Sequence, residues 1–206
     1  MFFKNLKLKI AYPVKLQRSG GFTLIELLVS ISIAMIIITV FVMQQRQWDE
    51  QLAVNTEAYE LALMIRQAQI YSLGVKGQLG VAGDIFNVGY GIYMRQGLSD
   101  KYIFYADKNH NEKYDAGEEI ETTKFDKGIT IKDVCGSVKN WCFEGGGSLF
   151  QADIRFFRPD TAAKILLTNV GGIDKDFPPV KITLQSAGGS KTSLITVDAS
   201  GQVSVQ

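Results

Sequence analysis

The sequence predicts an α+β protein: one long N-terminal helix, transmembrane in its first half, packed on a mostly antiparallel β-sheet domain. Three observations lead to this fold class. Residues 22–43 form an apolar run with a single charge, Glu26. From Gln44 to about Ser72 neither proline nor glycine interrupts the chain, and after Gly74 short apolar runs alternate with turn residues. A long uninterrupted periodic segment is typical of a helix, and short runs between turns are typical of antiparallel strands.

The 206 residues suffice for one modest domain plus an anchor. We divide them into a basic leader, residues 1–21; the helix, residues 22–73, of which 22–43 are transmembrane; and a globular β-rich domain, residues 74–206. The leader holds five basic side chains and no acidic one, so the formal net charge of +1 leaves −4 for the rest of the chain. By composition, the body is therefore not a basic nucleic-acid binder.

The apolar run could cross a hydrocarbon core of about 30 Å as a helix rising about 1.5 Å per residue. Because basic residues favour the cytoplasmic side, we expect a single-pass membrane protein with a cytoplasmic N-terminus and the β domain outside. Trp48 then lies where interfacial aromatic residues are enriched. A cleaved secretory signal is the competing interpretation, but the run is longer than a typical signal core and no small-x-small cleavage site follows it.

The segment after the span has the pattern of an amphipathic helix. Two sets of residues at seven-residue spacing share one stripe, which we expect to face a core. The stripe consists of Val54, Ala58, Leu61, Ile65, Ala68 and Ser72. A second stripe is polar and contains Glu57, Glu60 and Gln67. Leu73-Gly74 marks the end of the helix.

Alternating apolar residues and turn signals predict nine strands in the rest of the chain. They are Tyr90–Arg95, Tyr102–Ala106, Glu119–Phe125, Ile129–Val134, Ile154–Arg158, Lys164–Thr168, Val180–Leu184, Ser193–Val197 and Val203–Val205. Glycine pairs or triplets mark loops or turns at 145–147, 171–172 and 188–189.

Residues 18–34, RSGGFTLIELLVSISIA, resemble the N-terminus of type IV prepilins and type II secretion pseudopilins. In that family a membrane peptidase cuts after the glycine and methylates the new N-terminus. The resemblance therefore implies cleavage between Gly21 and Phe22, N-methylation of Phe22, and a match of Glu26 to the family's glutamate at mature position five. Met43 stands where many major pilins have a proline, so we expect no proline kink there.

The resemblance implies a structural subunit and not an enzyme: a minor pilin or pseudopilin of a type IV pilus or type II secretion pseudopilus. Its partners would be other pilin or pseudopilin subunits, the prepilin peptidase and an inner-membrane assembly platform. After insertion in the inner membrane, it would enter an extracytoplasmic filament. The alternative is a DNA- or surface-binding tip pilin of a DNA-uptake or adhesion filament.

Charge pairing can explain why a carboxylate, Glu26, lies near this cleavage point. A carboxylate costs about 2.5–3.5 kcal/mol at the centre of a membrane helix and less near the interface. Cleavage after Gly21 would create an α-amine with a pKa of about 8, which is cationic at neutral pH. One candidate partner of Glu26 is the amine of its own chain, one helical turn away. The other is the amine of a neighbouring subunit, and that pair would set the axial stagger between subunits of a helical assembly. The spacing leaves both open, and the family resemblance favours the second.

Residues 107–119, DKNHNEKYDAGEE, place oxygen ligands at the positions of an EF-type calcium loop. The candidate ligands are Asp107, Asn109, Asn111, Lys113 through its backbone carbonyl, Asp115 and Glu118. Against calcium, Glu112 replaces the usual glycine and the flanks read as strands, so a metal-free polar hairpin is the competing interpretation. The stretch also resembles the acidic hairpin of the GspH/FimT group of pseudopilins and minor pilins. No other cofactor is predicted.

The two cysteines, Cys135 and Cys142, predict a local disulfide if the domain is exported; two unrelated thiols are the alternative. Some FimT-group pilins bind DNA through basic residues near a C-terminal Gly-Arg motif. Here Gln202 follows Gly201 and no basic residue comes after it, which makes nucleic acid an improbable partner.

Three further motifs favour ordinary structural roles. His110 is interpreted as a solvated loop residue. The segment 190–192, after a glycine pair, is read as a hairpin turn instead of a phosphate loop. The run 155–158, Arg-Phe-Phe-Arg, could stack on bases, but alternation between core and surface in a strand explains it better.

Overall fold

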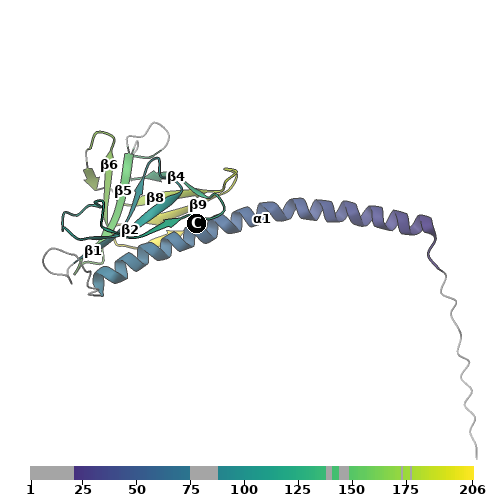
Figure 1. The fold of residues 1–206 in the computed structure, drawn as a ribbon, viewed down its shortest axis with the longest axis horizontal. Coiled ribbons are helices and arrows are strands. Elements are labelled where there is room, and N and C mark those ends of the chain that lie inside the picture. Colours follow the sequence, from purple (N-terminus) through teal and green to yellow (C-terminus); the bar gives the residue numbers. More distant parts are fainter. Residues whose placement is uncertain (1–20, 75–87, 138–140, 144–148, 173, 177) are drawn as a thin grey trace, which may run out of the picture. The chain divides into compact units, whose positions relative to one another are not determined.

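The computed structural model describes residues 21–74, 88–137, 141–143, 149–172, 174–176 and 178–206. Its elements are helix α1 (Leu24–Leu73) and a series of strands (Figure 1). The strands are β1 (Gly89–Arg95), β2 (Lys101–Asp107), β3 (Glu119–Lys124), β4 (Thr130–Cys135), β5 (Leu149–Phe156), β6 (Lys164–Asn169), β7 (Asp174–Asp176), β8 (Val180–Gln185), β9 (Thr192–Val197) and β10 (Val203–Val205). The chain divides into two compact units, Met1–Gln44 and Gln45–Gln206.

Helix α1 begins with an N-cap. The hydroxyl oxygen of Thr23 accepts the backbone N–H of Glu26 at 3.3 Å, and the Thr23 carbonyl accepts the N–H of Leu27 at 3.1 Å. Thr-x-x-Glu is also the spacing of a capping box, in which the glutamate reaches back to the cap residue. At the other end the N–H of Gly74 donates to the carbonyl of Ile70 at 2.8 Å. The predicted long helix is confirmed, and it starts two residues later than expected.

The predicted apolar stripe on the second half of α1 is also confirmed. All six of its residues are buried, whereas Glu60 is exposed and Glu57 and Gln67 are half-buried. Because every third or fourth residue returns to the same side of a helix, this stripe presents one continuous face to the sheets. The ring of Tyr71 meets those of Tyr90 on β1 and Phe104 on β2, with centroids 5.6 and 5.8 Å apart.

The strands form two antiparallel sheets, which confirms the predicted α+β fold class. The larger sheet has the order β3-β2-β1-β5-β6-β7, and the smaller has the order β10-β9-β8-β4. All their neighbours pair in antiparallel fashion. Alternate side chains of both sheets join the helix stripe in one hydrophobic core, which includes Ile92, Phe104 and Ile154 from the larger sheet and Ile182, Leu184 and Ile195 from the smaller.

Eight of the nine predicted strands agree with the structure to within about one residue at each end. The exception is β5, which was predicted at Ile154–Arg158 and runs from Leu149 to Phe156. Pro159 has no N–H to donate and restricts the residue before it, so the ladder ends earlier. The charge of Asp153 concealed the beginning of the strand, because a buried carboxylate breaks the apolar alternation.

Strand β7 was not predicted. Its three residues are all charged and pair through their backbones with β6, between Leu166↔Asp176 and Thr168↔Asp174. No apolar period marks such a short edge strand. The glycine triplet predicted as a loop lies outside the described residues.

Candidate functional site

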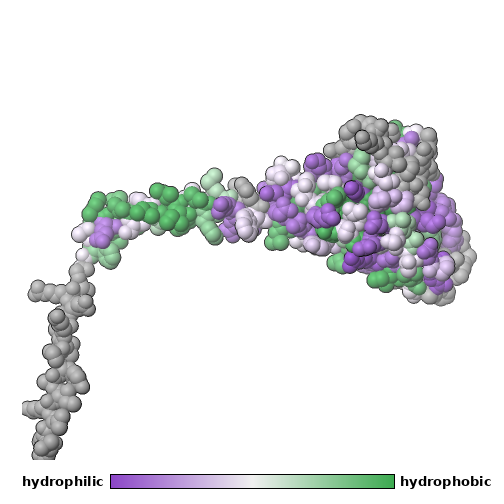
Figure 2. All heavy atoms as spheres, turned by 180° about the vertical axis from the view of Figure 1, so that it is seen from behind, coloured by the Kyte–Doolittle hydropathy of each residue, from purple (hydrophilic) through white to green (hydrophobic). Residues whose placement is uncertain are grey.

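The first half of α1 exposes its apolar side chains. The large hydrophobic residues between Phe22 and Met43 are each between 47% (Val29) and 80% (Leu24) exposed. Figure 2 shows hydrophobic residues gathered over this part of the helix. In the described part of the chain, α1 is the one helix long and apolar enough to cross a membrane. This surface needs lipid or other apolar helices around it, because exposed apolar area on this scale is unfavourable in water.

Most polar side chains within the span bond to the helix itself. The hydroxyls of Ser30, Ser32 and Thr39 donate to the carbonyls four residues earlier, at 2.7, 2.9 and 2.8 Å. These bonds satisfy groups that lipid cannot solvate. Glu26 differs, because its carboxylate has no hydrogen bond or ion pair to any residue that the structure describes. It is the group that still needs a partner.

Gly21 stands at the predicted cleavage point, and the fold does not require a glycine there. A Cβ built on Gly21 has no heavy atom within 4 Å. The folded chain therefore has room for a side chain at residue 21.

The hairpin between β2 and β3 carries the predicted calcium ligands, and backbone groups already occupy most of their oxygens. Buried Asp107 accepts the N–H of Asn111 at 3.1 Å and that of Glu112 at 2.9 Å. Buried Glu118 accepts the N–H groups of Lys108, Asn109 and Asp115 at 2.9, 3.2 and 2.9 Å. The two carboxylates therefore close the hairpin on its own backbone.

The remaining candidate ligands also bond within the hairpin. Asn109 and Asn111 both donate their side-chain amides to Oδ2 of Asp115, at 2.7 and 2.5 Å. Glu112, at the position usually held by glycine, has a φ of 65°, so the chain takes the left-handed turn there without a glycine. Among the described residues, Asp107, Asp115 and Glu118 do not bring one oxygen each within 4.8 Å of one another.

Calcium binding by this hairpin stays a prediction. It requires Glu118 to release N–H groups in order to bind bidentately, as the last residue of such a loop does. A rise in melting temperature of the full-length protein in millimolar calcium, lost in Asp107→Ala, would establish it, and an unchanged melting curve would leave the metal-free hairpin.

A buried polar network ties the hairpin to the face of the larger sheet opposite the core. The hydroxyl of Tyr105 donates to Asp153, and the N–H of Tyr114 in the hairpin donates to Oδ2 of Asp153 at 3.1 Å. Arg155 pairs with Glu112 at 3.0 Å. Gly91 makes room for this network, since a Cβ there would lie 2.7 Å from the ring of Tyr105 and 2.9 Å from the carbonyl of Ile154.

Burial raises the pKa of Asp153 to about 6, while the Tyr105 hydroxyl and the Arg155 charge act in the opposite direction. Burial likewise holds the pKa of Tyr105 well above its ordinary range, and the negative charge of Asp153 adds to this. The folded state therefore binds a proton at Asp153 more tightly than the unfolded state does.

The stability of the protein should therefore depend on pH through Asp153. The stabilisation from this group is fully present below the unfolded pKa and is lost as the pH rises through about 6. The loss of this stabilisation between pH 5 and pH 7 should lower the free energy of unfolding by about 1.3 kcal/mol. Denaturant unfolding of the full-length protein in neutral detergent, compared with Asp153→Asn, isolates the effect. If the difference between the two proteins is the same at both pH values, the assignment to Asp153 is wrong.

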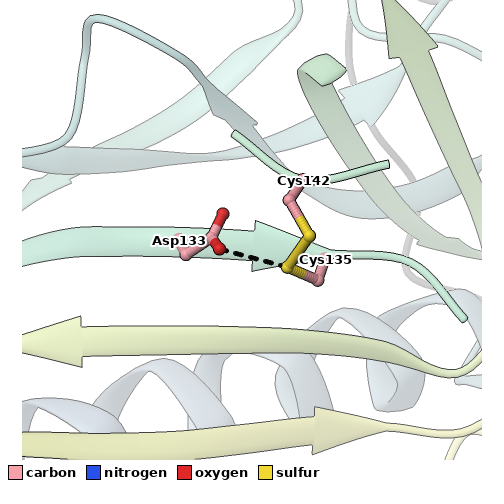
Figure 3. Close-up of side chains that lie close together, drawn as sticks. All are labelled: Asp133, Cys135 and Cys142. Atoms are coloured by element: carbon pink, nitrogen blue, oxygen red, sulfur yellow. Dashed lines mark hydrogen bonds between the residues drawn. A yellow bond between two sulfur atoms is a disulfide. The ribbon is translucent and has the colours of Figure 1, made fainter. Parts of the chain in front are cut away.

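Cys135 at the end of β4 forms a disulfide with Cys142, and the two residues also form an isolated antiparallel bridge (Figure 3). The disulfide closes a ring of eight residues, which in the chain-entropy account stabilises the fold by about 2.5 kcal/mol. Next to the bridge, Phe143 is buried in the core, and its carbonyl accepts the side-chain amide of Gln96 at 2.6 Å. The disulfide thus holds a short segment against the outer edge of the smaller sheet.

Asp133 lies beside this disulfide. One oxygen of its carboxylate and both sulfurs lie within 4.8 Å of one another, which resembles a set of metal ligands. Both cysteines are joined in the disulfide, so neither offers a thiolate and the set does not fit a metal ion.

Two of the other motifs take the structural roles expected of them, whereas the run 155–158 does not alternate between core and surface, because Arg155 and Phe156 are both buried. His110 is an exposed residue of the hairpin, with a φ of 58°. Ser190 lies in the turn between β8 and β9, where its hydroxyl donates to Glu50 of α1 at 2.9 Å. Arg155 and Phe156 are buried, so they cannot stack on bases or pair with phosphates.

The fold is that of a type IV pilin-like α+β protein, with a long apolar N-terminal helix and antiparallel sheets. Residues 16–42 match the family model of the prokaryotic N-terminal methylation motif. No curated protein and no solved structure matches the chain. The motif and the exposed helix together support the pilin and pseudopilin family, membrane anchoring, and a structural subunit that prepilin peptidase processes and other pilins join.

Sequence reasoning did not identify Asp153, Tyr105 or Asp133 as functional candidates. The available signal was a charged residue within an otherwise apolar strand, as in the segment FQADIRF around Asp153. That pattern does not show which residue of a neighbouring strand lies opposite, so the partners could not be named.

Proposed function

We propose that this chain is a minor pilin or pseudopilin of a type IV pilus or type II secretion pseudopilus, of the GspH/FimT-like subgroup. The leader is removed between Gly21 and Phe22, and Phe22 is N-methylated. The subunit resides in the inner membrane with its β domain outside until it enters the filament. The observation that carries the proposal is the methylation motif placed at the start of an exposed apolar helix.

Glu26 supports the same proposal. It lies in the first turn of α1, where the helix dipole favours a negative charge, and its carboxylate has no partner within the described chain. Cleavage before Phe22 would create a cation next to this turn. In a bundle of apolar helices an ion pair between subunits acts in a low dielectric and fixes their register.

Intact-mass analysis of the protein from cells with active prepilin peptidase tests the proposal. We expect a mature chain that begins at Phe22 and carries one added methyl group. Gly21→Val is the matched variant, because a side chain at residue 21 has free space around it and should leave the fold unchanged. That variant should keep its leader. A wild-type chain that retains residues 1–21 would rule out the proposed processing.

A further inference from the structure

The disulfide between Cys135 and Cys142 has an acidic neighbour held in a fixed position. Oδ2 of Asp133 lies 3.1 Å from Sγ of Cys135, the dashed contact in Figure 3. A sulfur in a disulfide has no hydrogen to donate, so the carboxylate lies against it without a hydrogen bond. The other oxygen, Oδ1, accepts the N–H of Phe143 at 2.9 Å, which holds the carboxylate in place.

An irregularity in β4 creates this arrangement. The pairing of β4 with β8 shifts between Ile131 and Asp133, so Lys132 is an extra residue. A bulge of this kind changes the direction in which the following side chains point. Asp133 and Cys135, two residues apart, then lie on the same side of the strand, while Ile131 and Val134 are both buried in the core.

We propose that Asp133 protects the Cys135–Cys142 disulfide from reduction by thiols. In such a reduction a thiolate attacks one sulfur, the S–S bond breaks, and the other sulfur leaves as a thiolate with the electron pair. A second thiolate then attacks the mixed disulfide, so the protein gains two electrons and the external thiol is oxidised to its own disulfide.

The carboxylate opposes both directions of attack. Attack on Cys135 brings an anion up to the sulfur that Oδ2 of Asp133 touches. Attack on Cys142 makes Cys135 the leaving thiolate, and its negative charge then develops against the same oxygen. Even in a dielectric as high as that of water, like charges about 5 Å apart repel enough to slow such a step about fourfold, and the lower dielectric near a protein surface strengthens the repulsion.

The rate of reduction depends on the solvent exposure of the disulfide as well as on the charge of Asp133. Cys135, Cys142 and Asp133 are each half-buried, so none of the three is sealed inside the core. Lys181 lies opposite Cys135 in the β4–β8 pair and is exposed; it stays unchanged in every variant below. Asp133→Asn is nearly isosteric and retains an oxygen for the N–H of Phe143, so it removes the charge with little change in packing.

The test is the rate of disulfide reduction in the full-length protein in neutral detergent, followed by thiol release. The chain has two cysteines, so the released thiols come from this disulfide alone. The reductants are 3-mercaptopropionate and cysteamine at the same thiolate concentration. Besides its thiolate, mercaptopropionate carries a second negative charge on its carboxylate, whereas cysteamine carries a positive charge on its ammonium group. Asp133→Asn should accelerate reduction by both reagents, because the attacking and leaving thiolates are anions in each case, but the acceleration should be at least threefold larger for mercaptopropionate than for cysteamine.

Glu121→Gln is the control, because it removes one negative charge from β3 in the other sheet. Its reduction rates should equal those of the wild type. Equal acceleration of Asp133→Asn with both reductants would show that the substitution loosens the site, and it would overturn the proposal. So would unchanged rates. Either result leaves the proposed filament function untouched, since that function depends on residues of the first half of α1.

Discussion

Glu26→Gln should leave the protein cleaved and methylated at Phe22 but reduce its incorporation into filaments at least tenfold. The N-cap bond joins the backbone N–H of residue 26 to the Thr23 hydroxyl and does not involve the side chain of residue 26, so the start of α1 is preserved. Glutamine also lowers the cost of inserting the helix into a membrane. The loss would therefore come from the missing charge and not from a missing helix or failed insertion.

The measurement compares the amount of mature subunit in the sheared filament fraction with the amount left in the membrane. Ser30→Ala is the control, because the Ser30 hydroxyl bonds within its own helix and is not needed by a neighbour. It should assemble like the wild type. Normal incorporation of Glu26→Gln would exclude the pairing role, both with the chain's own amine and with that of a neighbouring subunit.

Gly201→Ala should destabilise the protein by about 3–5 kcal/mol. Gly201 has a φ of 81°, in the left-handed region that L residues adopt at a cost. A Cβ there would also lie 2.4 Å from the carbonyl oxygen of Thr161 and 2.6 Å from Nε2 of Gln69. The glycine allows the turn between β9 and β10 to press against α1, where Arg66 donates to the carbonyl of Val203 at 3.1 Å.

Gly97→Ala separates the cost of a side chain in the left-handed conformation from the cost of close contacts around it. Gly97 has a φ of 85°, but no atom lies within 4 Å of the added carbon. It should cost only about 1–2 kcal/mol, the conformational part. Denaturant unfolding of both full-length variants in neutral detergent gives the difference. Equal losses at the two positions would mean that the close contacts at Gly201 relax without cost.

Gly201 is the C-terminal glycine that matches the DNA-binding motif of some minor pilins. Here the conformation and the crowding at Gly201 give that glycine a structural reason. Its presence is therefore no argument for a nucleic-acid partner.

The sequence alone predicted the long helix, its buried stripe and most of the strands. These features depend on local patterns: a 3.6-residue period, a two-residue period, and the glycines that end a run. The helix stripe from Val54 to Ser72 is buried as its seven-residue spacing predicts. The N-terminal motif is likewise a linear feature, readable before any folding is considered.

Only the tertiary structure revealed the roles of Asp153, Glu118 and Asp133. Asp153 accepts a hydrogen bond from the hydroxyl of Tyr105 across β1, because Gly91 leaves the space between them. Glu118 turns to backbone N–H groups, and a shift in strand pairing sets Asp133 beside a sulfur. Such roles depend on which strands are neighbours and in which register, and long-range pairing leaves no periodic trace in the sequence.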